Sequence, residues 1–288
     1  KIFDETQELT AGYIRYNEAD GKGNAMGKVH IQDYENKIIV NGNKAEYSDK
    51  MEMATVTDSA LFMTYSEKDT LYLHADTLKS VPDTIEGEKL IRAYYGTRFF
   101  RNDIQGICDS LVYYSKDSVV QLYKNPVIWS NIHQLSAEKI DMKQNKDAPD
   151  EIHLINNSYI ISKLDSGRFD QIKGRDMTGY IVNNEIDKID VDGSGQTLYY
   201  TREDTTIIGL NRAESSRISI QFKDDKIYRI AFVQSPQGTL KPLFEVSEEE
   251  KKLSGFDWKI DLRPMSKDDV FINKLTTEKP EEGSADEN

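Results

Sequence analysis

A pair made of a small residue followed by an acid recurs along this chain of 288 residues. The pair sits in strand-like sequence, and the steps between successive copies are 30, 33, 29, 38 and 38 residues. A drifting but continuous period of this length indicates repeats of one supersecondary unit. The copies are Ala45-Glu46, Ala75-Asp76, Cys108-Asp109, Ala137-Glu138, the weaker Arg175-Asp176, and Ala213-Glu214.

A second element precedes each pair, namely a turn or small residue followed by an apolar strand. Each repeat therefore holds two strands with a turn between them, and about a dozen strands follow one another as in an antiparallel meander. These segments are GKVHI from Gly27, SALFM from Ser59, GTRFF from Gly96, NPVIW from Asn125, NSYII from Asn157 and GQTLY from Gly195.

The spacing of apolar residues changes parity at the pair. Leu71 and Leu73 stand four and two residues before Ala75, whereas Leu111 and Tyr113 stand three and five residues after Cys108. Side chains of a strand alternate faces with period 2, so an inward set that is even before the pair and odd after it requires one extra residue. We expect a β-bulge at or just after the acid, which would bend every strand and fold the sheet over an apolar inner face.

The composition supports strands more than helices. The chain has 16 Tyr and 10 Phe, which suit a half-buried pleated surface. A helical pattern appears at SEEEKKL, residues 247–253, where Ser247 and Glu250 have the spacing of a capping box. We expect a single elongated domain of about six repeats over residues 1–264, a short C-terminal helix, and a mostly disordered acidic tail over residues 265–288.

Charge and hydropathy exclude several functional classes. The net charge of −13 opposes binding to nucleic acid or to an anionic membrane surface. No apolar run reaches the 18 residues of a membrane span. The single cysteine, Cys108, occupies a position that is Ala in four other copies, so we expect a small buried hydrophobe. The chain begins at Lys1 without a signal peptide, and export remains possible for a processed chain.

Motifs for catalysis, cofactors or metals are weak. The four histidines have no metal-type spacing, and His74 has the parity of a surface residue. The segment DKIDVDGSG at 187–195 fails the spacing of a calcium loop and is expected to be a turn between strands. The repeated acids are equivalent, whereas a glycosidase needs one asymmetric pair. Trp129 and Trp258 suit packing more than sugar stacking. We therefore expect no catalysis, no cofactor and no metal.

The inner face of the sheet is the remaining candidate site. If the folded sheet closes tightly this face is a core, and if it stays open it is a groove for long apolar ligands, which gain roughly 0.8 kcal/mol per buried CH₂. Periodicity alone leaves both possibilities open. The candidate lining residues are Leu71, Leu73, Leu111, Tyr113, Val127, Trp129, Ile140, Met142, Ile218, Ile220 and Phe222.

The repeats resemble the OstA-like family of lipopolysaccharide-transport proteins, which includes LptA-type bridge proteins and the amino-terminal domain of LptD. The resemblance covers roughly residues 20–264 and is most similar to the longer OstA-like proteins of Bacteroidetes. It rests on the strands AEYS, ADTL, CDSL and AEKI, on LYKNPVIW at 122–129, on GSGQTLYYTREDTTIIGLNRAESSRISIQFKDDKIYRIAF at 193–232, on PQGTLKPL, and on FDW and RP near 256–264.

This resemblance implies a bent antiparallel β-jellyroll, or β-taco, in the periplasm. It further implies an apolar interior that shields the lipid A acyl chains of lipopolysaccharide, with other transport proteins or further copies stacked on the edge strands. Two alternatives stay open at this stage. One is an exported structural or adhesive β-repeat protein that binds other proteins, and the other is a carbohydrate-active enzyme that uses an acidic pair.

Overall fold

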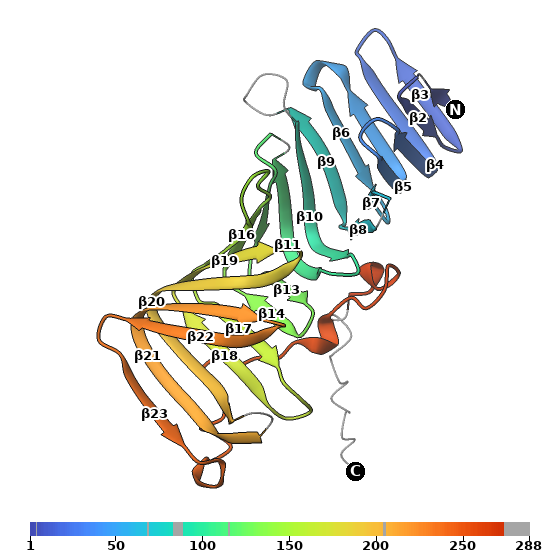
Figure 1. Ribbon diagram of the computed structural model, residues 1–288. Coiled ribbons are helices and arrows are strands. Elements are labelled where there is room, and N and C mark those ends of the chain that lie inside the picture. The colour runs from blue at the N-terminus through green and yellow to red at the C-terminus, as the bar shows by residue number, and fades with distance from the viewer. Residues whose placement is uncertain (4, 68, 83–88, 115, 204–205, 274–288) are drawn as a thin grey trace, which may run out of the picture.

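The protein is a long antiparallel sheet that folds over into two facing walls (Figure 1). The computed structural model describes all residues except 4, 68, 83–88, 115, 204–205 and 274–288. The described strands form one 23-stranded sheet whose first strands lie at one end of the molecule and whose last strands lie at the other. The all-β, folded-over architecture expected from the repeats is confirmed.

Long strands run from one wall into the other and create the fold. The first half of each long strand pairs within one wall and the second half pairs within the other, so that β5 bonds to β7 through Ile38–Asn41 and to β6 through Lys44–Ser48. These long strands are β4 (Lys22–Asp33), β5 (Ile38–Ser48), β10 (Lys89–Phe100), β11 (Gln105–Tyr114), β20 (Glu185–Glu203) and β21 (Thr206–Lys223).

We name the two walls A and B. Wall A contains β1 (Ile2–Phe3), β2 (Gln7–Thr10), β7 (Leu61–Tyr65), β8 (Thr70–His74), β13 (Val127–Ser130), β14 (His133–Ser136), β17 (Ser158–Lys163), β18 (Phe169–Gly174) and β23 (Gln237–Lys241). Wall B contains β3 (Tyr13–Asn17), β6 (Met53–Thr57), β9 (Thr77–Pro82), β12 (Val119–Tyr123), β15 (Lys139–Lys143), β16 (Asp150–Ile155), β19 (Asp176–Val182) and β22 (Lys226–Val233).

The bend between the walls contains the expected bulges, but in a different place. Tyr95 and Gly96 stand opposite Asp109 alone, because the register shifts between Tyr94 and Thr97. The extra residue therefore lies in the strand facing the small-acid pair and not in the strand that carries it. The extra residue also lies in the facing strand in β4, where residues 27–28 stand opposite Asn43, and in β20, where residues 193–194 stand opposite Ser216. The segment read as a turn at 187–195 is thus a continuous bulged strand.

Residue pairs with positive φ mark the bend through the layers. A left-handed backbone turns the chain sharply, and non-glycine residues other than Asn and Asp rarely adopt it. The pairs are Gly27-Lys28, Asp58-Ser59, Tyr95-Gly96, Lys124-Asn125, Asn156-Asn157, Gly193-Ser194 and Gln234-Ser235. Strands with a small-acid pair alternate with these turns, which explains why the motif recurs: Ala75 is fully buried at the bend, while Asp76 is exposed.

The acids bond to the neighbouring positive-φ turns. The Asn156 amide donates to Asp176 Oδ1 at 3.0 Å, Asn157 Nδ2 donates to Glu138, and Lys124 Nζ pairs with Asp109 at 3.0 Å. The expected outward direction of these acids is therefore observed. Cys108 is buried, and this burial raises the pKa of its thiol to about 12, consistent with a small apolar role.

The last described segment, residues 243–272, crosses the outer face of wall A (Figure 1). We call it the strap. It contains three short 3-10 turns, η2 (Leu243–Glu245), η3 (Ile260–Leu262) and η4 (Asp269–Phe271), and a further 3-10 turn, η1 (Asp49–Met51), lies between β5 and β6. Ser247 and Glu250 form the reciprocal capping contacts, at 3.0 and 3.3 Å, but a turn follows them, so the short C-terminal helix was a wrong prediction.

The strap carries ordered packing past residue 264, the expected end of the domain. The side chain of Val270 is fully buried. The ring of Phe271 lies 4.7 Å from that of His74. The part of the expected tail from residue 274 onward lies outside the described residues. In the portion of the chain that the structure covers, no helix is long and apolar enough to cross a membrane.

Candidate functional site: the inner faces of the two walls

The inner face of wall B carries one side chain per strand in direct cross-strand register. Adjacent members of this row stand opposite one another, so they form a continuous apolar ladder along the molecule. The row is Ile14, Ala25, Ala45, Val56, Leu78, Ala93, Leu111, Leu122, Ile140, Leu154, Met177, Val191, Ile218 and Phe232.

Wall A carries a matching row on its own inner face. Apolar residues occupy most of its positions, and a glycine, Gly106, occurs where the ring of Phe99 lies across the strand. The row is Leu9, Ile31, Val40, Phe62, Leu73, Phe99, Gly106, Ile128, Leu135, Ile160, Ile172, Thr197 and Ala213.

The interior is filled in its middle and looser toward the amino-terminal end. Leu122 and Ile140 are 0% exposed, so the two rows pack as a core in the middle of the sheet. Toward the first strands, Ile31, Val40 and Phe62 are only half-buried although their side chains face the same interior. Each half-buried side chain still offers apolar area to a ligand, whereas a fully buried one has already used it.

Most of the residues predicted to line the interior lie in or against this core. The core cluster and its flanking side chains include Leu71, Leu73, Leu111, Tyr113, Ile140, Met142, Ile218, Ile220 and Phe222. Val127 and Trp129 are placed differently. Ile128 between them faces the interior, and Trp129 Nε1 donates to Gln134 Oε1 at 3.2 Å on the opposite face. The prediction that Val127 and Trp129 line the interior was therefore wrong, because their side chains lie on the opposite face of β13.

The outer face of wall A is closed by the strap through buried glutamines. Gln134 Nε2 donates to the Asp257 carbonyl, and Gln134 Oε1 accepts from the Lys259 amide, both at 2.7 Å. Gln171 makes the same pair of contacts with the Lys251 carbonyl and the Leu253 amide, both at 2.8 Å. These bonds fix the strap on a surface that would otherwise expose apolar side chains of wall A.

Further along the chain, the strap contacts other side chains on the outer face of wall A. Arg263 Nε donates to Gln105 Oε1 at 2.8 Å, and Arg98 donates to the Val270 carbonyl at 3.4 Å. His74 bonds to the Ala60 carbonyl at 2.8 Å and is buried under Phe271. Its outward parity was predicted, but its expected surface exposure was wrong because the strap covers it.

A polar contact joins the walls on the side away from the bend. Asn131 Nδ2, in the turn between β13 and β14, donates to Asp225 at 3.2 Å, and Asp225 lies in the turn between β21 and β22. His133 Nε2 stands 3.5 Å from the same carboxylate. Arg263 of the strap donates to the Asn131 carbonyl at 3.1 Å. We call Asn131, His133 and Asp225 the clasp.

Together with Ser162, the clasp residues His133 and Asp225 have the composition of a serine-hydrolase triad without its accessibility. His133 Nδ1 lies 2.7 Å from Ser162 Oγ, and its other nitrogen faces Asp225. His133 and Ser162 are only 1% and 3% exposed, so a substrate cannot reach the hydroxyl in this arrangement. Burial lowers the pKa of His133, and Asp225 raises it by a smaller amount. The arrangement fits a structural link better than a nucleophile.

One buried carboxyl group lies on the same inner face. Asp170 stands opposite Ser162 in the β17–β18 pair and accepts a hydrogen bond from the Tyr200 amide at 2.9 Å. Burial raises the pKa of Asp170 to about 6, with the Tyr200 amide acting in the opposite direction. Sequence reasoning missed Asp170, His133 and the glutamines, since none of them has a distinctive spacing.

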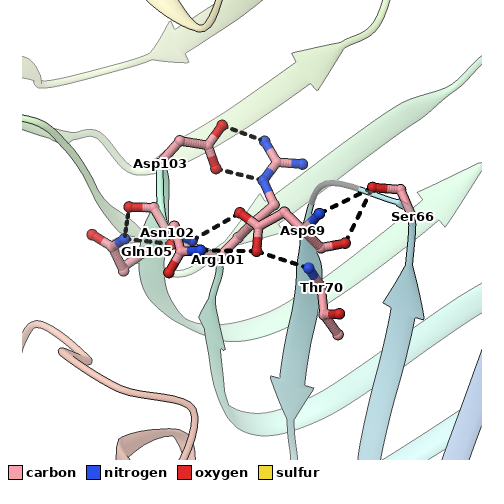
Figure 2. Close-up of polar contacts among 7 residues, drawn as sticks. All are labelled: Ser66, Asp69, Thr70, Arg101, Asn102, Asp103 and Gln105. Carbon is pink, nitrogen blue, oxygen red and sulfur yellow. Dashed lines mark hydrogen bonds and ion pairs between the residues drawn. The ribbon is translucent and has the colours of Figure 1, made fainter.

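A polar network on the outside joins the β7–β8 and β10–β11 turns (Figure 2). The carboxylate of Asp69 accepts from the Thr70 amide at 2.8 Å and from Asn102 Nδ2 at 3.1 Å. Arg101 and Asp103 form a two-bond ion pair at 2.5 and 2.9 Å beside it. A surface hollow of about 430 Å³ lies next to this network, and Lys267 of the strap is part of its lining. The network holds the two turns together.

Comparisons with known proteins give one type of match. Among solved structures, the chain is similar to LptH from Pseudomonas aeruginosa, described as the LptA homologous periplasmic component of the lipopolysaccharide transport device. That alignment has a TM-score of 0.35 and 11% sequence identity, and it covers 41% of this chain and 81% of LptH. Neither a protein-family model nor a curated protein matches the sequence.

Proposed function

We propose that this chain is a non-catalytic periplasmic protein that binds lipopolysaccharide and shields its lipid A acyl chains along the inner faces of walls A and B. The observation that carries the proposal is the pair of facing cross-strand rows, which offers an apolar path along the sheet. The half-buried members Ile31, Val40 and Phe62 are the part of this path that retains apolar area for a ligand. The sequence resemblance to the OstA-like family supports the same role.

Photo-crosslinking tests the proposal directly. A benzoylphenylalanine at position 62 replaces a large inward aromatic side chain, and one at position 63 replaces the adjacent Met63 on the other face of β7. Incubation with purified lipopolysaccharide should give an adduct from position 62 and only background from position 63. Equal labelling from both positions, or labelling from position 63 alone, would contradict an internal path.

The alternative is an exported structural or adhesive protein that binds other proteins through its outer surface. A filled interior would suit that role, and the middle of the sheet has one, since Leu122 and Ile140 are fully buried. The two functions separate at the amino-terminal end, where the inner face is half-buried. Absence of adducts from every inward position, together with intact folding, would favour the alternative.

We further propose that the terminal strands contact other transport-system proteins or further copies of this chain. Among the described strands, β3 pairs only with β4, and β22 pairs only with β21, so each leaves one backbone edge without a partner strand. Tyr13 on β3 and Tyr228 on β22 are 56% and 71% exposed. Such edges can receive a strand from a partner. Sedimentation velocity across a concentration series should then show association, and a constant monomer mass would argue against self-stacking.

A further inference from the structure

The outward side chains of wall B form a cross-strand row of their own. The strap does not reach them, because its contacts given above are all with wall A. Each member of the row lies one position along its strand from a member of the inner row, so the two rows face opposite sides of the wall. The outer row is Arg15, Asn24, Glu46, Thr55, Lys79, Arg92, Val112, Gln121, Asp141, His153, Thr178, Asp190, Ser219 and Ala231.

The acids of the outer row are already paired on their own strands. Each has a lysine two residues before it, which is the spacing that places both side chains on one face of a strand. These acids therefore have a local counter-ion and need none from a partner. The pairs are Lys44–Glu46 at 2.7 Å, Lys139–Asp141 at 2.9 Å and Lys188–Asp190 at 2.6 Å.

Lys79 and Arg92 are the exception to this pairing. They stand directly opposite each other in the β9–β10 pair, and among the described residues neither forms an ion pair with an acid. Their next neighbours in the row are the uncharged Thr55 and Val112. Like charges directly opposite each other destabilise a sheet, so this arrangement is unfavourable unless an anion binds beside it. Two adjacent unpaired cations contrast with the net charge of −13 of the whole chain.

Aromatic side chains surround the two cations. Arg92 Nη1 donates to the Tyr94 hydroxyl at 3.3 Å, and Lys79 Nζ lies 5.9 Å from the centre of the Tyr94 ring. The ring of Tyr95 lies 6.2 Å from that of Tyr94, and Tyr95 is 59% exposed. Lys79, Arg92 and Tyr94 are half-buried, so all of them remain within reach of a partner. We call these four residues the basic patch.

The chemistry of the basic patch matches an acidic stretch of polypeptide. Arginine and tyrosine are enriched at the energetic centres of protein–protein interfaces, and a guanidinium binds a carboxylate through two parallel hydrogen bonds. A nucleic acid or an anionic membrane would bring a long array of negative charge against a chain of net charge −13. A peptide segment brings only a few carboxylates, together with apolar groups that can pack on the tyrosine rings.

We propose that the outer face of wall B at β9 and β10 is a docking surface for an acidic segment of another protein. Carboxylates of that segment bind Lys79 and Arg92, and its apolar atoms pack on Tyr94 and Tyr95. This surface is separate from the inner path and from the edges of the terminal strands, so it goes beyond the proposed function.

Fluorescence anisotropy with a fluorescein-labelled peptide of alternating Glu and Gly tests the surface. A peptide of alternating Gln and Gly is its uncharged counterpart. The unaltered chain should bind the Glu peptide more tightly than the Gln peptide, and the preference should weaken as salt is added. The double variant Lys79→Gln/Arg92→Gln should lose about tenfold in affinity for the Glu peptide, with less than about twofold change for the Gln peptide.

The matched control is Lys143→Gln/Arg229→Gln. It removes the same charge from exposed outward positions on β15 and β22 of the same wall. It should change the affinity for the Glu peptide by less than about twofold. An equal loss from both double variants would show that the peptide senses only the net charge, which would overturn the docking surface.

Stability measurements separate docking from a structural role. Lys79→Gln/Arg92→Gln removes a like-charge pair, so its free energy of unfolding in urea should be unchanged or higher. The charge-preserving exchange Lys79→Arg/Arg92→Lys should bind the Glu peptide nearly as the unaltered chain does. A marked loss of stability in the neutral variant, or a loss of binding in the exchange variant with its fold intact, would contradict a surface that selects for charge.

Other occupants give different results. Tighter binding of tripolyphosphate or of phosphatidylglycerol vesicles than of the Glu peptide, abolished in Lys79→Gln/Arg92→Gln, would assign the patch to phosphate groups and overturn the proposal. A sedimentation mass that rises with concentration in the unaltered chain but not in this variant would assign it to a second copy, with the same consequence. Crosslinking from position 62 reports on the inner path alone, so failure of the docking surface and failure of the proposed function are distinguishable.

Discussion

His133 in wall A and Asp225 in wall B meet across the side of the fold opposite the bend, with Nε2 3.5 Å from Oδ1. Asn131 bonds to the same carboxylate, so the clasp joins two turns that are 94 residues apart in the sequence. The bend connects the walls through the backbone itself, but the clasp connects them through side chains alone. It is therefore the connection that a single substitution can remove.

We predict that Asp225→Ala loosens both turns of the clasp without unfolding the sheet. The substitution removes the hydrogen bond from Asn131 and the carboxylate that raises the pKa of His133. Hydrogen exchange should accelerate in the β13–β14 and β21–β22 turns, with a loss of roughly 1–2 kcal/mol in the free energy of unfolding. The pKa of His133, followed by NMR, should fall further below its ordinary value.

Asp224→Ala is the matched control, because Asp224 lies in the same turn but has no contact with wall A among the hydrogen bonds and ion pairs described above. It should leave the exchange rates of the β13–β14 turn unchanged. Unaltered exchange in the Asp225→Ala protein would show that the clasp does not hold the walls.

We predict that Asp170→Asn stabilises the protein at neutral pH. The pKa of Asp170 is raised from 3.8 to about 6, so the folded state holds this proton more firmly than the unfolded chain. The group is most favourable below pH 3.8, and its contribution is lost as the pH rises through 6. A shift of about two units corresponds to roughly 3 kcal/mol at pH 7.5, an upper limit for the gain. The side-chain oxygen of asparagine can still accept a hydrogen bond from the Tyr200 amide.

Urea unfolding at pH 5.0 and pH 7.5 checks this prediction. The free energy of unfolding should fall less between pH 5.0 and pH 7.5 in the variant than in the unaltered chain. His133 acts in the opposite direction in both proteins. Its folded pKa is lowered, so the unfolded chain binds the proton more readily and stability decreases as the pH falls below 6.5. The exposed substitution Asp187→Asn is the control, and an equal effect from it would refute the assignment to Asp170.

We predict that Gln134→Leu releases the middle of the strap. The substitution leaves three polar groups without a partner, namely Trp129 Nε1, the Lys259 amide and the Asp257 carbonyl. The expected loss in the free energy of unfolding is about 2–4 kcal/mol. Both tryptophans, Trp129 and Trp258, lie at this junction, so their fluorescence should change before the main unfolding transition. Gln144→Leu, at an exposed position, should change neither quantity.

The sequence predicted the walls better than the bend. The period of the small-acid pairs and the change of parity across them are properties of an inner face that must stay apolar on both sides of a bend, so the folded-over sheet could be inferred from residues such as Leu73, Leu111 and Ile140. The strand that contains the extra residue could not be inferred, because a bulge in either partner shifts the register equally. The structure places it at Tyr95-Gly96, opposite Asp109.

The strap and its anchors could not be predicted for a different reason. Val127, Ile128 and Trp129 are all buried, since the interior covers one face of β13 and the strap covers the other. A continuous apolar run carries no information about which parity faces inward. The strap itself has neither helical nor strand period, and it is held by single contacts from residues such as Gln134 and Gln171. Contacts of this kind leave no pattern in one sequence.

The close contact between Gly106 and Phe99 gives a last prediction, on the packing of the wall A row. The two residues stand opposite each other in the β10–β11 pair, and the ring of Phe99 lies over the glycine. A Cβ at position 106 would lie 2.3 Å from Phe99 Cζ. Gly106→Ala must therefore displace the ring of Phe99 from its place in the wall A row. We expect a loss of about 1–3 kcal/mol in the free energy of unfolding, measured with urea. Gly167→Ala is the matched control, because no atom lies within 4 Å of its added Cβ and its φ is not positive, and it should be neutral or slightly stabilising. If both substitutions are tolerated equally, the ring of Phe99 can move aside freely, and the wall A row at β10 and β11 is open to a ligand rather than packed as core.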